Sequence, residues 1–220
     1  ETSLSDDGNI DLLWSQYNLD TLNSNYINIP SSDLSASFKV VSDHDNLYVY
    51  VKVNDDNDNA NDGVNLFFSL GNSDQQSYSY SDFQLRVNND GNFILKNNQI
   101  NFQGIWTDVV KTAGVVEYEI CIPLTSVNQR IENDATIGFS VIVDDNETQF
   151  KQIAWNYGNY VWTDPSKMGE ILLYSPIVDF TVEENVTSID IKKGEIVSFN
   201  VISSVNYKYF RWDFQNDGII

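Results

Sequence analysis

The chain has 220 residues with 32 acidic and 12 basic side chains, giving a formal net charge of −20 at pH 7. So acidic a chain lacks the basic face that nucleic-acid binding requires, and its charge opposes docking on anionic membranes. An aromatic content of 13% argues against disorder. No apolar run approaches the ~20 residues of a membrane helix, so we expect a folded chain without membrane insertion.

Alternation of apolar and polar residues predicts short β-strands along most of the chain. A hairpin is expected where residues 37–41 and 47–53 flank a polar turn. Further strands are predicted at residues 64–70, 83–88, 92–96, 115–122, 137–143, 150–155 and 170–174, and a short helical turn at 123–127. The fold class predicted for residues 1–175 is therefore all-β, an antiparallel β-sandwich of jelly-roll-like form.

The strand expected at 115–122 has two distinct faces. Tyr118 and Ile120 lie on its apolar face, whereas Glu117 and Glu119 share the other face with the single cysteine, Cys121. We interpret this acidic face as exposed to solvent. One cysteine forms no internal disulfide and excludes a cysteine-based zinc site.

A domain boundary is predicted at Ser175-Pro176. Residues 176–220 have the strand rhythm of an immunoglobulin-like β-sandwich, but too few strands for a complete one. The motif at 210–218, Phe-Arg-Trp-Asp-Phe-Gln-Asn-Asp-Gly, resembles the signature of polycystic-kidney-disease-type (PKD-type) domains, which act as spacers. We interpret the chain as a piece of a longer protein that ends within this second domain.

Three stretches carry a resemblance that covers nearly all of the first domain. They are Asp6-Asp-Gly-Asn-Ile-Asp11 with Trp14, residues 43–55, and Asn159-Tyr-Val-Trp-Thr-Asp-Pro-Ser-Lys-Met-Gly169. Residues 4–174 thereby resemble a family 9 carbohydrate-binding module. The resemblance implies a calcium-containing β-sandwich, found beside xylanases and other glycoside hydrolases, that holds the end of a glycan chain between two tryptophans.

The resemblance also implies which residues contact sugar. Trp162 falls on the position of the second sandwiching tryptophan, Asn159 on a sugar-binding asparagine and Arg86 on a sugar-contacting arginine. Two positions depart from the family. Asn59 stands at about the place of the first tryptophan, and Asn65 stands where a glutamate reads the sugar. These departures put reducing-end specificity in doubt.

The residues themselves leave alternatives open. The ring of Trp162 can stack on a pyranose or anchor the core, and Arg86 can bond hydroxyls or pair with an acid. Trp106 is a candidate for a replacement stacking residue. Tyr80 precedes the strand that carries Arg86 and can line the same face.

Calcium is the other candidate ligand. Residues 54–63 are rich in carboxylate and amide oxygens, the ligands that calcium prefers, although Ala60 and the lack of a closing Glu exclude an EF-hand. The competing interpretation is a solvated acidic turn. The family resemblance and the charge favour one structural calcium, for which we select Asp55, Asp62 and Asp145.

Catalysis finds little support, since His44 is the sole histidine and no hydrolase motif is present. We therefore expect no enzyme. The leading hypothesis is a monomeric, non-catalytic module that binds plant-type polysaccharide, such as xylan or cellulose ends. It would belong to a larger secreted or surface-anchored bacterial protein, beside a glycoside hydrolase or on the cell surface. The alternative is a structural or adhesive β-sandwich that has lost the sugar site.

Overall fold

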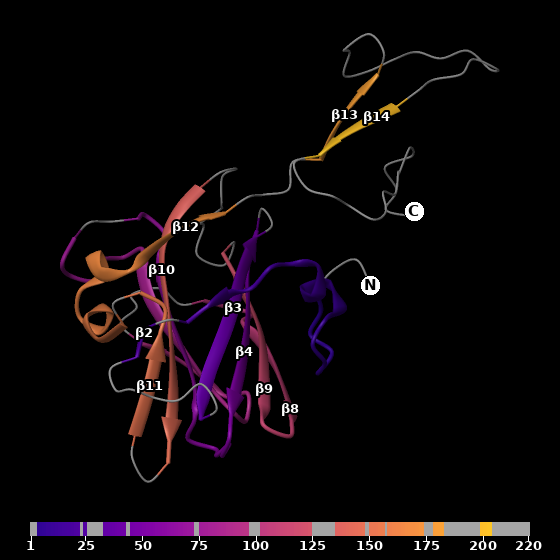
Figure 1. Ribbon diagram of the computed structural model, residues 1–220. Helices are drawn as coiled ribbons and strands as arrows, with labels where there is room; N and C mark the ends of the chain where they lie inside the picture. Colours follow the sequence, from indigo (N-terminus) through magenta and orange to yellow (C-terminus); the bar gives the residue numbers. More distant parts are fainter. Residues whose placement is uncertain are drawn as a thin grey trace. The chain divides into compact units, whose positions relative to one another are not determined.

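The computed structural model describes the chain in ordered stretches, within which all statements below are made. They are residues 4–22, 24–25, 33–42, 45–72, 75–96, 102–124, 135–147, 150–156, 158–173, 178–182 and 199–203. Two compact units are present, Glu1–Ser175 and Pro176–Ile220. The first unit is a sandwich of two antiparallel sheets (Figure 1), so the predicted all-β fold class is confirmed.

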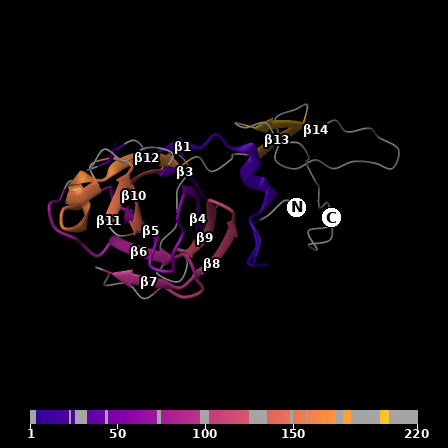
Figure 2. The ribbon, with the colours of Figure 1, turned by 60° about the horizontal axis from the view of Figure 1, so that its bottom comes forward.

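The first sheet, sheet A, has five strands in the order β1-β3-β4-β9-β8. They are Asp20–Thr21 (β1), Leu34–Ser42 (β3), Asn46–Asp55 (β4), Val115–Pro123 (β9) and Trp106–Thr112 (β8). The second sheet, sheet B, has the order β2-β11-β10-β5-β6-β7, with β12 also paired to β10. Its strands are Ser24–Asn25 (β2), Phe150–Ala154 (β11), Ala135–Asn146 (β10), Gly63–Ser69 (β5), Asp82–Asn88 (β6), Phe93–Lys96 (β7) and Gly169–Leu173 (β12). In Figure 2, strands β3, β4, β8 and β9 of sheet A lie to the right of strands β6, β7, β10 and β11 of sheet B.

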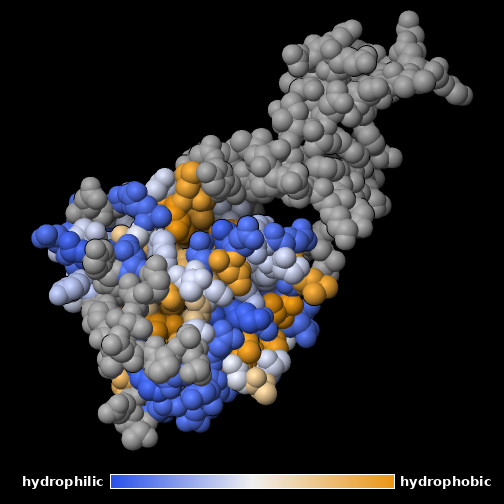
Figure 3. All heavy atoms as spheres, in the orientation of Figure 1, coloured by the Kyte–Doolittle hydropathy of each residue, from blue (hydrophilic) through white to orange (hydrophobic). Residues whose placement is uncertain are grey.

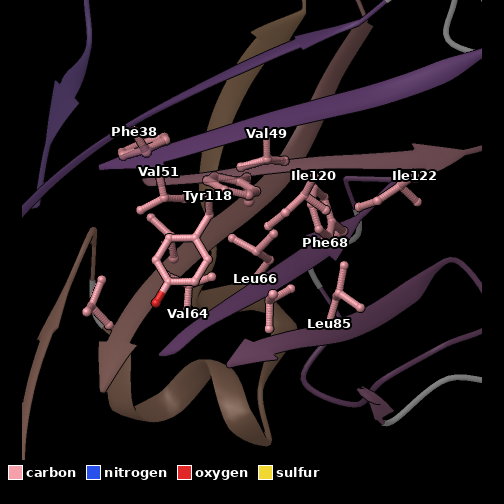
Figure 4. Packing of buried hydrophobic residues seen from close by; sticks show 14 of the residues in the cluster. Phe38, Val49, Val51, Val64, Leu66, Phe68, Leu85, Tyr118, Ile120 and Ile122 are labelled. Carbon is pink, nitrogen blue, oxygen red and sulfur yellow. The ribbon is translucent and has the colours of Figure 1, made fainter. Parts of the chain in front are cut away.

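Alternate side chains of the two sheets meet in the interior, as strand geometry requires. Val49, Val51 and Ile120 of sheet A face Val64 and Leu66 of sheet B (Figure 4), and all five are fully buried. Because a one-residue slip would turn each of these side chains outward, this pattern fixes the register of the strands. The opposite face of each sheet points away from this core.

The structure adds elements that the sequence patterns did not predict. The hairpin of β3 and β4 is confirmed, with Phe38 paired to Val51. Strand β8 was missed, because its residues do not alternate clearly between apolar and polar. Three short 3-10 helices also lie in the described chain, Leu12–Gln16 (η1), Gly158–Trp162 (η3) and Pro165–Lys167 (η4), and none of them is long enough to cross a membrane. Most of the helical turn expected at 123–127, like His44, lies outside the described residues.

The acidic face of β9 is covered, contrary to the expectation of an exposed face. Glu119 is 0% exposed because the N-terminal segment, Ser5–Tyr17, packs over the outside of sheet A. The Asp11 backbone N–H donates to Glu119 Oε2 at 2.8 Å, and the Asp7 N–H donates to Asp108 Oδ2 at 3.2 Å. Trp14 stacks on Tyr50 of β4, with ring centroids 5.3 Å apart. The sequence did not reveal this cover because the segment has no strand periodicity.

Gly63 begins β5 at a point where the backbone of β6 is very close. A Cβ at this position would collide with the Val87 carbonyl oxygen and lie 2.9 Å from Asn88 Cα. We expect Gly63→Ala to lower the free energy of unfolding by ~1–3 kcal/mol, the usual range for overpacking. Gly71→Ala is the matched control, because its Cβ would meet only the movable Ser81 side chain. Urea unfolding of both variants measures the difference, and equal stabilities would contradict the expectation.

The second unit is described only in part. Strands Val178–Val182 (β13) and Phe199–Ser203 (β14) pair antiparallel. The motif at 210–218 lies outside the described residues. A PKD-type domain here therefore stays a prediction.

Candidate functional site

The outward face of sheet B carries a second, smaller cluster and a group of polar side chains. Phe67 of β5, Ile142 of β10 and Ala154 of β11 alternate with residues of the main core, so they point away from sheet A. Val161 and Met168 pack on them from the segment that contains η3 and η4. In Figures 1 and 2 this segment lies on the side of β10 and β11 that faces away from β3 and β4.

Trp162 is half-buried at the end of η3. Its ring meets Phe67 edge-on, with centroids 4.9 Å apart and an interplanar angle of 87°. The loop around it is held in place, since Tyr78 Oη donates to the Val161 carbonyl at 2.5 Å. Asp164 caps η4 by accepting from the Ser166 backbone N–H at 3.1 Å. The indole is thus held against Phe67, and part of its surface faces solvent.

Five polar side chains cross the same face of sheet B, and we call them the polar strip. They come from four adjacent strands, with Gln152 on β11, Asp144 on β10, Asn65 on β5, and Gln84 and Arg86 on β6. Arg86 forms an ion pair with Asp144 and donates to the Asn61 carbonyl at 2.8 Å. Leu85 and Val87 point into the core, as alternation predicts.

Of the candidate sugar residues, the structure brings Trp162 and Arg86 to the same face. Asn159 lies in η3, but its side chain is outside the described residues. Tyr80 is 57% exposed in the turn before β6, in the same loop as Tyr78. Trp106 lies instead on sheet A, where its ring is 6.5 Å from that of Tyr48. The structure therefore does not bring Trp106 together with Trp162.

Three members of the polar strip, Gln84, Asp144 and Gln152, were not found by sequence reasoning. Gln84 shares the alternation of Arg86, which is a signal that points to it. Asp144 and Gln152 are ordinary polar residues near strand ends in the sequence. Their importance arises only because β10 pairs with both β5 and β11, and local patterns do not reveal that pairing.

A group of carboxylates lies at one end of the sandwich, where β4 and β10 end. Asp55 of sheet A, Asp145 of sheet B and Glu147 place carboxylate oxygens within 4.8 Å of one another. Asp145 is 0% exposed, and within the described residues its nearest partner is the Lys151 ammonium. Burial, together with the nearby Asp55 charge, raises the pKa of Asp145 to about 6. The end that carries the β10–β11 turn in Figure 1 is predominantly hydrophilic in Figure 3.

The third metal candidate, Asp62, lies beside this group and not within it. Its two carboxylate oxygens accept the backbone N–H groups of Asn146 at 2.6 Å and Asn59 at 2.7 Å, which hold the loop after β4. Lys151 approaches the group from β11, with Nζ 3.3 Å from Asp145 Oδ2 and 2.5 Å from Glu147 Oε2. Glu147 was missed because it follows the strand and meets Asp55 only in the folded chain.

Comparison with known proteins relates this chain to enzymes several times its length. It is 29% identical over 201 residues to endo-1,4-beta-xylanase A of Thermoanaerobacterium saccharolyticum, covering 86% of this chain and 17% of that enzyme. It is 29% identical over 188 residues to exoglucanase XynX of Acetivibrio thermocellus, covering 84% of this chain and 16% of that protein. The chain therefore spans about a sixth of these relatives.

Solved structures share its fold. A family 9 carbohydrate-binding module of Caldicellulosiruptor kristjanssonii, in complex with cellotriose, superposes with a TM-score of 0.71 at 22% identity, over 86% of this chain and 96% of that one. A glucose complex of a module from the same organism gives 0.67, over 78% and 91%. The model of the family described as carbohydrate family 9 binding domain-like matches residues 7–175. The chain belongs to this family.

Proposed function

We propose that residues 7–175 form a non-catalytic module that binds polysaccharide or oligosaccharide. The observation that carries this proposal is the placement of the half-buried Trp162 ring on the same outward sheet face as the polar strip. An aromatic face packs on the apolar C–H face of a pyranose, while charged and amide groups bond the ring hydroxyls. The Arg86 side chain is 20% exposed, which leaves part of it accessible to a ligand.

The ligand class follows from the relatives. The similar modules were solved with glucose and with cellotriose, and the sequence relatives are a xylanase and an exoglucanase. We propose β-1,4-linked plant polysaccharide, such as xylan or cellulose chain ends, as the ligand. By the same argument, the module would accompany a glycoside hydrolase outside the bacterial cell. The sequence motif at 210–218 supports residues 176–220 as the start of a PKD-type spacer.

A structural or adhesive role is the second candidate, and Asn59 favours it. This residue stands near the place where the family has its first sandwiching tryptophan. Its side chain donates to the Asn146 carbonyl at 2.9 Å, so it holds the loop and offers no aromatic surface. A module of this kind would keep the fold without binding sugar.

Calorimetric titration of cellotriose and xylotriose into the chain separates the two roles. Trp162→Ala is expected to weaken binding by roughly thirtyfold or more, because a central aromatic anchor contributes ~2 kcal/mol or more. Trp106→Ala is the matched control and is expected to bind as the wild type does, since Trp106 lies on the other sheet. No heat from the wild type with any glycan would favour the structural role. Equal binding by both variants would contradict the assigned site.

We also propose a structural calcium ion bound by Asp55, Asp145 and Glu147. The group fits calcium because it offers several carboxylate oxygens, including two buried ones on Asp145 whose nearest ionic partner in the described chain is Lys151 Nζ, 3.3 Å from Oδ2. Asp33 and Asp56 lie next to it with Glu147, and Lys151 alone supplies positive charge to these five acids in the described chain. An ion here would join the end of sheet A to the end of sheet B.

A further inference from the structure

One carboxylate holds the polar strip together. Asp144 Oδ1 accepts a hydrogen bond from Gln152 Nε2 at 2.7 Å, and Oδ2 accepts from Asn65 Nδ2 at 2.8 Å. The Arg86 guanidinium pairs with the same Oδ2. Donors from three different strands, β11, β5 and β6, therefore converge on one residue of β10. Asp144 itself is only 6% exposed, which leaves little of its surface for a ligand.

The arrangement places each donor group at a defined point on the sheet face. Arg86 reaches over β5 to meet Asp144, and its second nitrogen is held by the Asn61 carbonyl. The Asn65 amide turns its nitrogen to Asp144, which leaves its oxygen to accept from Gln84 Nε2 at 3.3 Å. A charged acceptor binds such donors more strongly than a neutral one does. Long side chains that would otherwise sample many rotamers are thereby ordered before a ligand arrives.

We propose that Asp144 is the positioning residue of the glycan site: its carboxylate fixes the orientation of Arg86 and Gln152, which contact the sugar hydroxyls, and holds the fully buried Asn65 between them. This inference rests on the proposed carbohydrate binding. It differs from a plain structural role because the three partners lie on the outward sheet face that also carries Trp162, and not in the core between the sheets.

Asp144→Asn tests this assignment with little change in shape. The wild-type carboxylate accepts through both oxygens, whereas asparagine offers one acceptor and one N–H₂ donor. The new donor must face either Gln152 or the Asn65–Arg86 pair, so at least one partner has to turn away. We expect the dissociation constant for cellotriose to rise about tenfold. In combination with Arg86→Ala, the loss should be smaller than the product of the two single losses, because the residues act together.

A second readout needs no glycan. Side-chain ¹H–¹⁵N resonances of the Arg86 guanidinium and the Gln152 amide report their order in the free protein, and Asp144→Asn should shift or broaden them. Asp108→Asn, a buried carboxylate on sheet A, is the matched control and should change neither these signals nor the affinity.

The two readouts distinguish the possible failures. Unchanged resonances in Asp144→Asn would overturn the positioning role, whatever happens to affinity. Shifted resonances with unchanged affinity would also overturn it, because the ordered groups would then not serve the sugar. If the wild type binds no glycan, both the proposed carbohydrate binding and the positioning role of Asp144 are contradicted. The shifted resonances would then describe a structural network only.

Discussion

Replacing Glu119 with glutamine is expected to raise the melting temperature of the chain at pH 8 by roughly 5–10 °C and to change it much less at pH 5. Glu119 is fully buried beneath the N-terminal segment, with Oε1 lacking a hydrogen-bond partner within the described residues. Burial and the adjacent Asp11 carboxylate raise the pKa of Glu119 to about 7 from its ordinary value of 4.5. The folded protein therefore retains a proton that the unfolded chain releases at a lower pH.

The sign of the pH dependence follows from this difference. At and below pH ~4.5 both states carry the proton, and the stabilising contribution is complete. Between about pH 4.5 and pH 7 the unfolded chain has released this proton while the folded chain still holds it. Roughly 3 kcal/mol of stability is lost over this range. Glutamine mimics the protonated acid at every pH. Its oxygen still accepts from the Asp11 N–H, and its amide donates toward the Asp11 carboxylate.

Glu117→Gln is the matched control, two residues along the same face of β9. Glu117 accepts from the Tyr50 hydroxyl and lies 3.9 Å from Lys52 Nζ, so its charge has partners. This variant should show no gain at pH 8. Thermal melts from pH 5 to pH 8, kept above the pI of about 4.1, make the comparison. An equal shift in melting temperature for Glu119→Gln at pH 5 and pH 8 would contradict the claim that folded Glu119 retains its proton.

The fold was largely predictable because strand alternation is a local property. Hydrophobic positions in β4, β5, β6, β9 and β10 repeat every second residue, and each of these strands forms where expected. The N-terminal segment was not predictable in the same way. Its backbone is held by Asp108 and Glu119, which are about a hundred residues away in the chain. The acids on β9 therefore gave the wrong prediction of an exposed face.

The candidate site was also predictable only in part. Arg86 and Trp162 were found through the family resemblance, and alternation on β6 placed Arg86 on the face opposite Leu85 and Val87. The role of Asp144 depends on which strands are neighbours. Asp144 and Gly63 are paired across β10 and β5, although some eighty residues separate them. Patterns along one strand cannot show that Asp144 meets donors from strands on both of its sides.

Strand β10 links the two proposed sites. Successive residues of a strand point to opposite faces, so Asp144 faces the polar strip while Asp145 faces the carboxylates at the end of the interior. The next residue, Asn146, bonds the loop that holds Arg86, with its Nδ2 2.7 Å from the Asn61 carbonyl. An ion at Asp145 would therefore stabilise the same stretch of β10 that orders the glycan-facing side chains.

Removing calcium with a chelator is expected to lower the melting temperature of the wild-type chain by roughly 5–10 °C, compared with a solution holding calcium at about 100 times its dissociation constant. An ion that binds only the folded state at that concentration contributes ~2.7 kcal/mol. Differential scanning calorimetry with EDTA, calcium or magnesium makes the comparison. Magnesium should restore less stability, because it requires a more regular octahedral set of ligands than this group offers.

Asp145→Asn tests whether Asp145 is a calcium ligand. We expect it to lower stability when calcium is present and not to lower it when EDTA is present. With calcium, the variant should be less stable than the wild type, because it loses a buried ligand that no other side chain replaces. With EDTA it should be at least as stable, because one of several crowded, mutually repelling acids is gone and Lys151 keeps Asp33 and Glu147 as partners. Asp164→Asn, in the η4 cap far along the chain, should retain the full calcium response. A calcium shift that survives in Asp145→Asn would place the ion elsewhere, and no shift in the wild type would contradict a structural calcium ion.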